Sequence, residues 1–443
     1  IMASPDVRKI TFTGSTAVGK LLMQNAAGTM KRISMELGGN APLIVFDDAD
    51  IDAAVAGTVA NKFRNAGQVC VAINRIYVQD RIYDEYVGKL AKAIGELTVG
   101  DGFAPGVTVG PLIRESAVEK VDFGETPSLA VLEQEAFADC KALKTVRLPR
   151  SLEAMGQGVF SASGLVSVDL REYPLTEIPN KTFMGSTLVT VELPDTVKTV
   201  GHSAFRDCTE LSHVTFPTRE PLWLMSNAFY NTALESVSIP ANLTYIGEYA
   251  LTGLRRLSAF EIEETNEKYT VIDGLLYSKD GKKLIAAPAG KTGSITLPES
   301  LEILGFGAFE NSALTKIYFA PESNILTFGY RCFYNASITD IRLPESVISL
   351  DYYAFAMCKN LVKVTIPAET KLKGIYEGVF YGCSALSDIE LPNGIVEISD
   401  FAFYGCSSLK KLPFEKNSGI LGIYDYAFAE CGLSAIEIPE SVI

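Results

Sequence analysis

Apolar and polar residues follow two different patterns along the chain of 443 residues. From about residue 127 onward a short unit returns, with an alternating strand such as LVKVTIP and a turn that carries Ala-Phe. Alternating apolar positions favour half-buried strands, and a unit of about 22–25 residues cannot bury its apolar side alone. The pattern therefore predicts a stacked solenoid of about twelve such units over residues 127–443.

One aromatic position marks each unit of the predicted solenoid. A Pro ends each strand and directs the chain into the turn, and the aromatic residue of the turn is expected to form an internal stack with its neighbours. Leu251 takes this position once. The Phe residues at this position are Phe137, Phe160, Phe183, Phe205, Phe229, Phe309, Phe333, Phe355, Phe380, Phe403 and Phe428.

The repeats are interrupted by an insertion at 266–294. Two apolar runs, YTVIDGLLYS and KKLIAAP, flank Asp280-Gly281, and Asp-Gly between such runs favours a hairpin turn. We expect this β-hairpin insertion to project from the solenoid, where it could bind a partner. An insertion packed against the repeats is the favoured alternative to such a partner-binding finger.

Residues 1–121 lack this period and alternate between strand-like and helix-like segments. KITFTG and PLIVF are expected strands. The segment after Asp48 and Asp50 is an expected helix that either Asp could cap, and a further helix is expected at about 81–97. This order predicts an α/β domain over 1–121, followed by a junction at 122–126.

Charge separates the same two regions. Residues 1–121 hold 13 basic and 13 acidic residues, so the net charge of −14 lies entirely in 122–443. An acidic solenoid does not suit nucleic acid, whose phosphates need Lys and Arg. No apolar run is long enough to span a membrane.

Cysteines recur at one position of the repeat, three residues after the Phe. Single cysteines at that spacing indicate small buried side chains, and a zinc site would need close pairs that are absent. Disulfides between neighbouring units are the less favoured alternative, and only Cys332 is out of phase. His202 and His213 are expected on the surface.

A glycine-rich turn near the start raises the question of nucleotide binding. Gly14 to Lys20 reads G-x-x-x-x-G-K, but Leu21 replaces the Ser or Thr that would ligate Mg²⁺. Leu21 and Leu22 are expected on the buried side of a helix. The turn could hold some phosphate at the helix N-terminus, or be an ordinary strand-turn-helix.

Two further motifs carry residues with possible chemistry, MELGGN with Glu36 and FRNAGQVCVAINR with Cys70. Taken singly, a lone Cys is usually inert and a lone Glu is usually solvated. Together with FTGSTAVGK, however, these segments closely resemble the aldehyde dehydrogenases, and most of all the succinate-semialdehyde dehydrogenases. The three segments keep the order and spacing of that family.

The resemblance implies a role for each matching residue. Cys70 would be the nucleophile that attacks the aldehyde, its N–H would supply half of an oxyanion hole, and Glu36 would activate the water that hydrolyses the thioester. Arg64 would pair with the carboxylate of a semialdehyde substrate. Gly14 and Ser15 would lie against the pyrophosphate of NAD or NADP, with Val18 near its adenosine end.

The resemblance covers roughly a quarter of the family's usual chain. The segments that complete the oxyanion hole and hold the cofactor ribose have no counterpart here, so we expect this chain alone to be inactive. The abrupt switch near residue 121 suggests a chimera that joins a dehydrogenase piece to an unrelated repeat.

Residues 127–443 resemble the BspA-type leucine-rich repeats of bacterial and protist cell surfaces. This resemblance rests on units such as LPESVISLDYYAFAMCKNL and on the DGLLYSKDGKKLIAAP insertion. It implies adhesion and protein binding through an unknown partner, with no catalytic residues. The two regions imply different locations, the cytoplasm for the first and the cell surface for the second. The alternative to an enzyme is thus a non-enzymatic interaction solenoid with an inert dehydrogenase piece.

Overall fold

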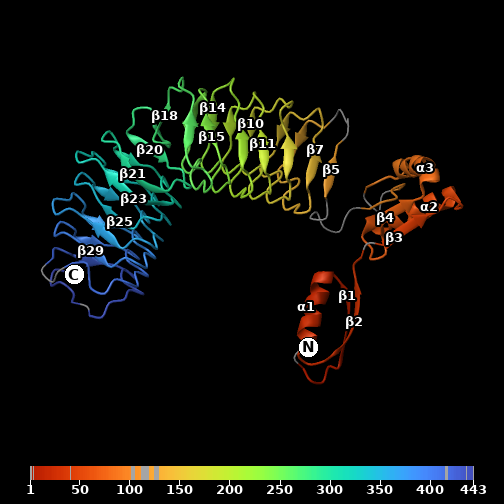
Figure 1. Cartoon of the computed structure of the whole chain (residues 1–443), viewed down its shortest axis with the longest axis horizontal. Helices are drawn as coiled ribbons and strands as arrows, with labels where there is room; N and C mark the ends of the chain where they lie inside the picture. The colour runs from red at the N-terminus through yellow and green to blue at the C-terminus, as the bar shows by residue number, and fades with distance from the viewer. Residues whose placement is uncertain are drawn as a thin grey trace. The chain divides into compact units, whose positions relative to one another are not determined.

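The structure, a computed structural model, describes the whole chain except residues 1, 3, 40, 101–104, 111–118, 124–128, 415–417, 436 and 443. It divides into two compact units, Ile1–Ala117 and Val118–Ile443 (Figure 1). In the described part of the chain, no helix has the length and apolar character needed to cross a membrane.

The first unit contains two pairs of parallel strands, β1 with β2 and β3 with β4, and each pair is connected through a helix. This βαβ order is the expected α/β arrangement. The elements are β1 (Lys9–Gly14), α1 (Thr16–Ala27), β2 (Arg32–Leu37), β3 (Ala41–Val45), α2 (Ile51–Lys62), η1 (Arg64–Gly67), β4 (Ile73–Val78), η2 (Asp80–Ile82) and α3 (Tyr83–Gly95).

Local sequence explains where the helices of the first unit begin. The Ser15 side chain accepts a hydrogen bond from the Val18 N–H at the start of α1, and Asp50, one of the two candidate caps, accepts from the Ala53 N–H at the start of α2. The core of this unit is small. Val45, Val55 and Tyr86 form its buried cluster.

The prediction that Leu21 lies on a buried side of α1 is wrong. Leu21 is 55% exposed, and Leu22 is only half-buried. The buried residues of α1 are Gly19 and Ala26, because the helix packs on β1 and β2 along a narrow line of small side chains. A Cβ at residue 19 would approach the Leu37 side chain to 2.7 Å.

The second unit is a solenoid whose successive strands follow a curved stack (Figure 1). The first strand of each repeat belongs to one series of parallel strands, which pair in three separate sheets of five, two and five strands. Its members are β5 (Lys120–Asp122), β7 (Thr145–Arg147), β9 (Ser167–Asp169), β11 (Thr190–Glu192), β13 (His213–Thr215), β15 (Val237–Ile239), β17 (Phe260–Ile262), β21 (Gly293–Leu297), β23 (Leu314–Phe319), β25 (Asp340–Arg342), β27 (Lys363–Thr365) and β29 (Asp388–Glu390).

A second series of strands lies after the Pro of each repeat and pairs in four separate sheets of two, four, six and three strands. Its members are β6 (Val131–Leu132), β8 (Ala154–Met155), β10 (Glu177–Ile178), β12 (Thr199–Val200), β14 (Leu222–Leu224), β16 (Leu243–Ile246), β18 (Tyr269–Ile272), β19 (Leu275–Ser278), β20 (Lys283–Ala286), β22 (Ile303–Leu304), β24 (Thr327–Phe328), β26 (Ser349–Leu350), β28 (Gly374–Ile375), β30 (Glu397–Ile398) and β31 (Gly422–Ile423).

The Ala-Phe turns form a third ladder. The Phe355 N–H donates to the Val379 carbonyl of the next repeat, and the other Phe turns from Phe137 to Phe403 repeat this bond. The residues two before and two after each aromatic position have positive φ, as at Tyr353 and Met357. The expected internal Phe stack is confirmed, with ring centroids 5.0 Å apart for Phe333 and Phe355. The stack is interrupted at Leu251 and resumes at Phe309.

The inserted segment does not project, so that expectation is wrong. β18 pairs antiparallel with β19, β19 pairs antiparallel with β20, and β20 continues the parallel ladder into β22. Leu275, Leu276 and Tyr277 are buried. The run expected as one strand also turns at Asp273-Gly274, both with positive φ. The inserted segment packs against the repeats because these apolar side chains continue the core of the solenoid.

The ladder of the second unit begins before residue 127, since β5 pairs with β7. Lys120–Asp122 therefore lies with the solenoid, although the sequence placed residues up to 121 in the first domain. Residues 124–126 of the expected junction lie outside the described residues. The number of repeats, about twelve, stays a prediction.

Candidate functional site

The turn before α1 presents a free helix N-terminus. Gly14 and Ser15 are exposed, and the Thr16 and Ala17 N–H groups donate to no described residue. Val18 is 43% exposed on the first turn. Free N–H groups at a helix start favour a phosphate group, so these residues fit the pyrophosphate of a dinucleotide. Val18 stays the residue expected near the adenosine end, and no residue of this chain is assigned to the nicotinamide end.

Cys70 lies in an exposed turn between η1 and β4. Cys70 is exposed, and neither its thiol nor its N–H makes a hydrogen bond with a described residue. Three consecutive residues before it, Asn65, Ala66 and Gly67, have positive φ. Such backbone is costly for residues with a Cβ and often marks a functional turn. Arg64 is exposed, with no ion pair to any described residue.

Glu36 lies on β2 and is exposed, and no described residue donates a hydrogen bond to its side chain. It belongs to the β1–β2 pair, whereas Cys70 leads into β4 of the β3–β4 pair. Among the described residues no hydrogen bond or ion pair joins Glu36, Arg64 and Cys70. A general base must come within about 3 Å of its proton, directly or through one water. The described contacts therefore do not assemble a catalytic centre.

The solenoid cysteines are mostly buried free thiols, as their spacing predicted. The Cys358 thiol donates to the Phe333 carbonyl oxygen at 2.9 Å, and Cys208 donates to the Phe183 carbonyl in the same way. Burial raises the pKa of Cys208 to about 11. The Cys208 thiol is therefore a poor nucleophile. His202 and His213 are exposed, as expected.

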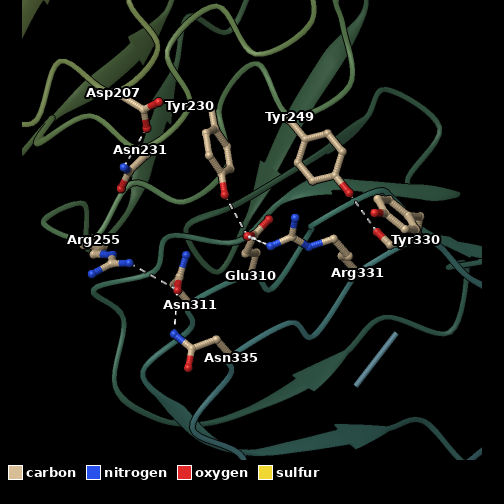
Figure 2. A network of polar contacts seen from close by, with 10 residues as sticks. All are labelled: Asp207, Tyr230, Asn231, Tyr249, Arg255, Glu310, Asn311, Tyr330, Arg331 and Asn335. Carbon is tan, nitrogen blue, oxygen red and sulfur yellow. Dashed lines mark hydrogen bonds and ion pairs between the residues drawn. The ribbon is translucent and has the colours of Figure 1, made fainter. Parts of the chain in front are cut away.

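Sequence reasoning missed a buried polar network where the Phe stack is interrupted (Figure 2). Glu310 is 2% exposed, and its Oε1 accepts from the Tyr230 hydroxyl at 2.8 Å and from Arg331 Nη2 at 2.9 Å. The Tyr249 hydroxyl donates to the Tyr330 carbonyl. Tyr230 and Tyr249 precede the inserted segment and Glu310 follows it, so the network connects the two parts of the stack.

Burial raises the pKa of Glu310, against the opposing effects of Arg331 and the Tyr230 hydroxyl. Its Oε2 has no hydrogen-bond partner among the described residues. The sequence gives only two signals for this network. Leu251 replaces the Phe at the aromatic position of its repeat, and Glu310 directly follows Phe309, the next Phe at that position. Pattern analysis of single units does not relate residues 80 positions apart.

Two family sequence profiles match different parts of the chain. That of the aldehyde dehydrogenase family matches residues 1–123. That of the BspA type leucine rich repeat region matches in six copies over 114–219, 176–274, 289–374 and 326–443. The two matches overlap at 114–123, where the structure already has β5.

The chain is similar to succinate-semialdehyde dehydrogenases over its first region only. It is 62% identical over 122 residues to the mitochondrial enzyme of Arabidopsis thaliana, which is 28% of this chain and 23% of that enzyme. It is 57% identical over 122 residues to the NADP(+) enzyme of Escherichia coli, which is 28% of this chain and 25% of that enzyme. The chain thus spans about a quarter of the length of these relatives.

A crystal structure of a leucine-rich repeat protein from Eubacterium ventriosum resembles the solenoid. Its TM-score is 0.54 at 20% identity, covering 73% of this chain and 85% of that one. At this identity the likeness supports the fold alone. It agrees with the ladders and turns described above.

Proposed function

We propose that the solenoid of this chain, which belongs to the family of BspA-type leucine-rich repeats, is a protein-binding surface. One observation supports this most directly. Along β9, β11 and β13 the middle residue is buried and both flanking residues are exposed. The buried residues alone build the core, so the exposed ones are free to serve recognition.

The side chains at the exposed positions contribute little to the stability of the solenoid. Ion pairs between neighbouring strands, such as Lys316–Asp340 and Lys363–Asp388, have both partners about half exposed. Such pairs contribute about 0–1 kcal/mol to stability. Trp223, on β14, is 52% exposed and stacks edge-on with Tyr245 at 6.4 Å. Exposed Trp and Tyr are the side chains most enriched in protein interfaces.

The test uses the full chain, with purified collagen, laminin and fibrinogen immobilised as probes. We expect at least one of these proteins to bind saturably. Substitution of exposed ladder residues, Thr190→Arg with His213→Glu, should weaken binding, whereas Cys70→Ala in the first unit should not. Binding that is absent for all probes, or that is lost with Cys70→Ala instead, would contradict the proposal.

We also propose that the first unit retains residues that take part in aldehyde oxidation, but that it does not catalyse this reaction by itself. In a complete site the Cys70 thiolate would attack the aldehyde carbon, and the carbonyl oxygen would take the charge facing the Cys70 N–H. After this adduct has given up a hydride and become a thioester, Glu36 would take a proton from the water that hydrolyses it. Bound NAD or NADP would supply the hydride acceptor, and Arg64 suits a substrate carboxylate.

The exposure of the thiols supports a direct test. Cys70 is exposed, whereas the other seven are buried or half-buried. Iodoacetamide should therefore modify Cys70 first in the native chain, and Cys70→Ala should remove that fast phase. With succinate semialdehyde and NAD or NADP, we expect no reduced cofactor above the Cys70→Ala level. Turnover that depends on Cys70 would show that the chain does assemble a site.

A further inference from the structure

The turn ladder of the solenoid changes character halfway along the chain. Before the inserted segment, its turns carry mixed polar residues, among them Glu135, Asp139, Lys181 and His202. After it, the turns carry aromatic and acidic residues. We call the second set the aromatic-acidic face, and it consists of residues 305–311, 329–335, 351–357, 376–382, 399–405 and 424–430.

The aromatic rings of this face form a continuous row outside the internal Phe stack. Tyr330 contacts Tyr353 with centroids 6.4 Å apart, and Tyr353 contacts Tyr381 at 6.3 Å. Tyr381 stacks on Tyr404 at 5.0 Å. The row ends where Phe401 stacks on Tyr426, which is 64% exposed. No such row exists in the described turns before Tyr230.

Carboxylates border the aromatic row. The Tyr353 hydroxyl donates to Glu377 and the Tyr404 hydroxyl donates to Glu430, which hold both rings in place. The other carboxylates of the face are Asp351, Asp400 and Asp425. The single cation in these turns, Arg331, is already paired with buried Glu310 (Figure 2). The exposed part of the face is therefore negative and aromatic.

The repeat itself does not require aromatic residues here. Tyr353, Phe401 and Tyr426 occupy the positive-φ position two residues before the Phe, where Gly158 and Gly378 also occur. Glycine adopts this conformation at no steric cost, whereas a bulky side chain is strained by it. Tyr426 is exposed and the other two rings are half-buried, and none of the three belongs to the buried core, so the rings are available to a ligand.

The same face already shows how it would hold a cation. Within it, the Arg331 guanidinium lies 3.8 Å from the centre of the Tyr334 ring, and in the turns before the insertion Arg206 lies 5.3 Å from the centre of the Tyr230 ring. Guanidinium groups stack on Tyr rings and pair with carboxylates at the same time. We propose that the aromatic-acidic face binds an arginine-bearing segment of a partner protein. This inference rests on the proposed protein-binding function and specifies its partner.

The test uses the full chain and a fluorescein-labelled twelve-residue peptide of alternating Gly and Arg, followed by fluorescence anisotropy. Saturable binding is expected. The matched peptide with citrulline, which is neutral and nearly isosteric, should bind at least tenfold more weakly. The triple variant Asp351→Asn, Asp400→Asn, Asp425→Asn should also weaken binding at least tenfold. Asn keeps the Oδ1 acceptor that Asp400 offers to the Asp425 N–H.

A matched control removes three charges from the turns before the insertion, with Glu135→Gln, Asp139→Asn and Glu248→Gln. It should leave the dissociation constant within twofold. A second variant, Tyr352→Ala with Tyr424→Ala, removes two rings that are 50% and 54% exposed and should weaken binding severalfold. Fluorescence of Trp223, the only Trp of the chain, checks the fold of each variant.

Equal weakening by both charge variants would overturn the inference, because it would mean diffuse attraction to an acidic protein. Undiminished binding of the citrulline peptide, or no saturable binding at all, would also overturn it. If the peptide fails while a matrix protein still binds through the exposed ladder residues, only this inference fails. If neither binds, the proposed function fails with it.

Discussion

The two units bury apolar side chains in different ways. In the solenoid, Phe355, Leu350 and Val347 are fully buried within one repeat, and every neighbouring repeat adds to the same core. In the first unit, Val45, Val55 and Tyr86 make up the buried cluster, while Leu21, Met23 and Phe46 are more than half exposed. A repeat finds its packing partners in the adjacent units, so its core is local in sequence.

The first unit has no neighbouring repeats that could provide packing partners for its apolar side chains. Its strands occur as two separate parallel pairs, and parallel pairs are normally covered on both faces. Ile44 on β3 is 58% exposed, so the described residues of this unit leave more than half of it uncovered. The two units therefore differ more in whether their buried side chains form a continuous core than in composition. The following predictions test this difference.

The largest effect is expected from Phe355→Ala. Phe355 is fully buried and stacks between Phe333 and Phe380, so its removal leaves a cavity in the continuous core. We expect a loss of about 3–5 kcal/mol in the free energy of unfolding. Urea titration followed by Trp223 fluorescence measures it. A loss below about 1 kcal/mol would mean that the repeats do not share one core.

A smaller effect is expected from Glu310→Ala, which removes the acceptor shared by Tyr230 and Arg331 across the interruption of the stack. We expect a loss of about 1–3 kcal/mol, since buried donors lose their partner while Arg331 can still reach solvent. The same Trp223 titration applies. Thr315→Ala, on the solenoid surface, is the control and should leave the urea midpoint unchanged.

A pH series should reveal the protonation of Glu310. Its folded-state pKa is raised above the ordinary 4.5, mainly by burial. Its contribution to the free energy of unfolding is then largest below pH 4.5 and falls as the pH rises through the raised pKa. Glu310→Gln lacks this dependence, so its stability relative to the parent should rise with pH. A constant difference between pH 4 and 8 would contradict the raised pKa.

The smallest effect is expected from Leu21→Ala, within about 0.5 kcal/mol, because the side chain is already largely exposed. Helix ellipticity at 222 nm reports the first unit, since the described α-helices all lie in it. A loss above 1 kcal/mol in the free energy of unfolding would mean that α1 packs against another surface in solution. The two units would then bury their apolar side chains in more similar ways.

The candidate residues show how far sequence reasoning reaches. Ser15 as a cap, Cys70 in an exposed turn and the buried cysteines of the repeats follow from local pattern or resemblance. Leu21 and the inserted segment were misplaced, because burial depends on which neighbours are available. Glu310 was missed, since Tyr230 and Arg331 reach it from repeats on opposite sides of the insertion.

Residue spacing alone was enough to predict the solenoid, its Phe stack and the α/β order of the first region, because each depends on contacts between neighbouring segments. Tertiary structure decided whether the insertion packs, where the ladder begins and which charges are buried. It also brought separate turns into one aromatic-acidic face. These features depend on residues tens of positions apart, and their positions in space follow from the stacking of whole repeats.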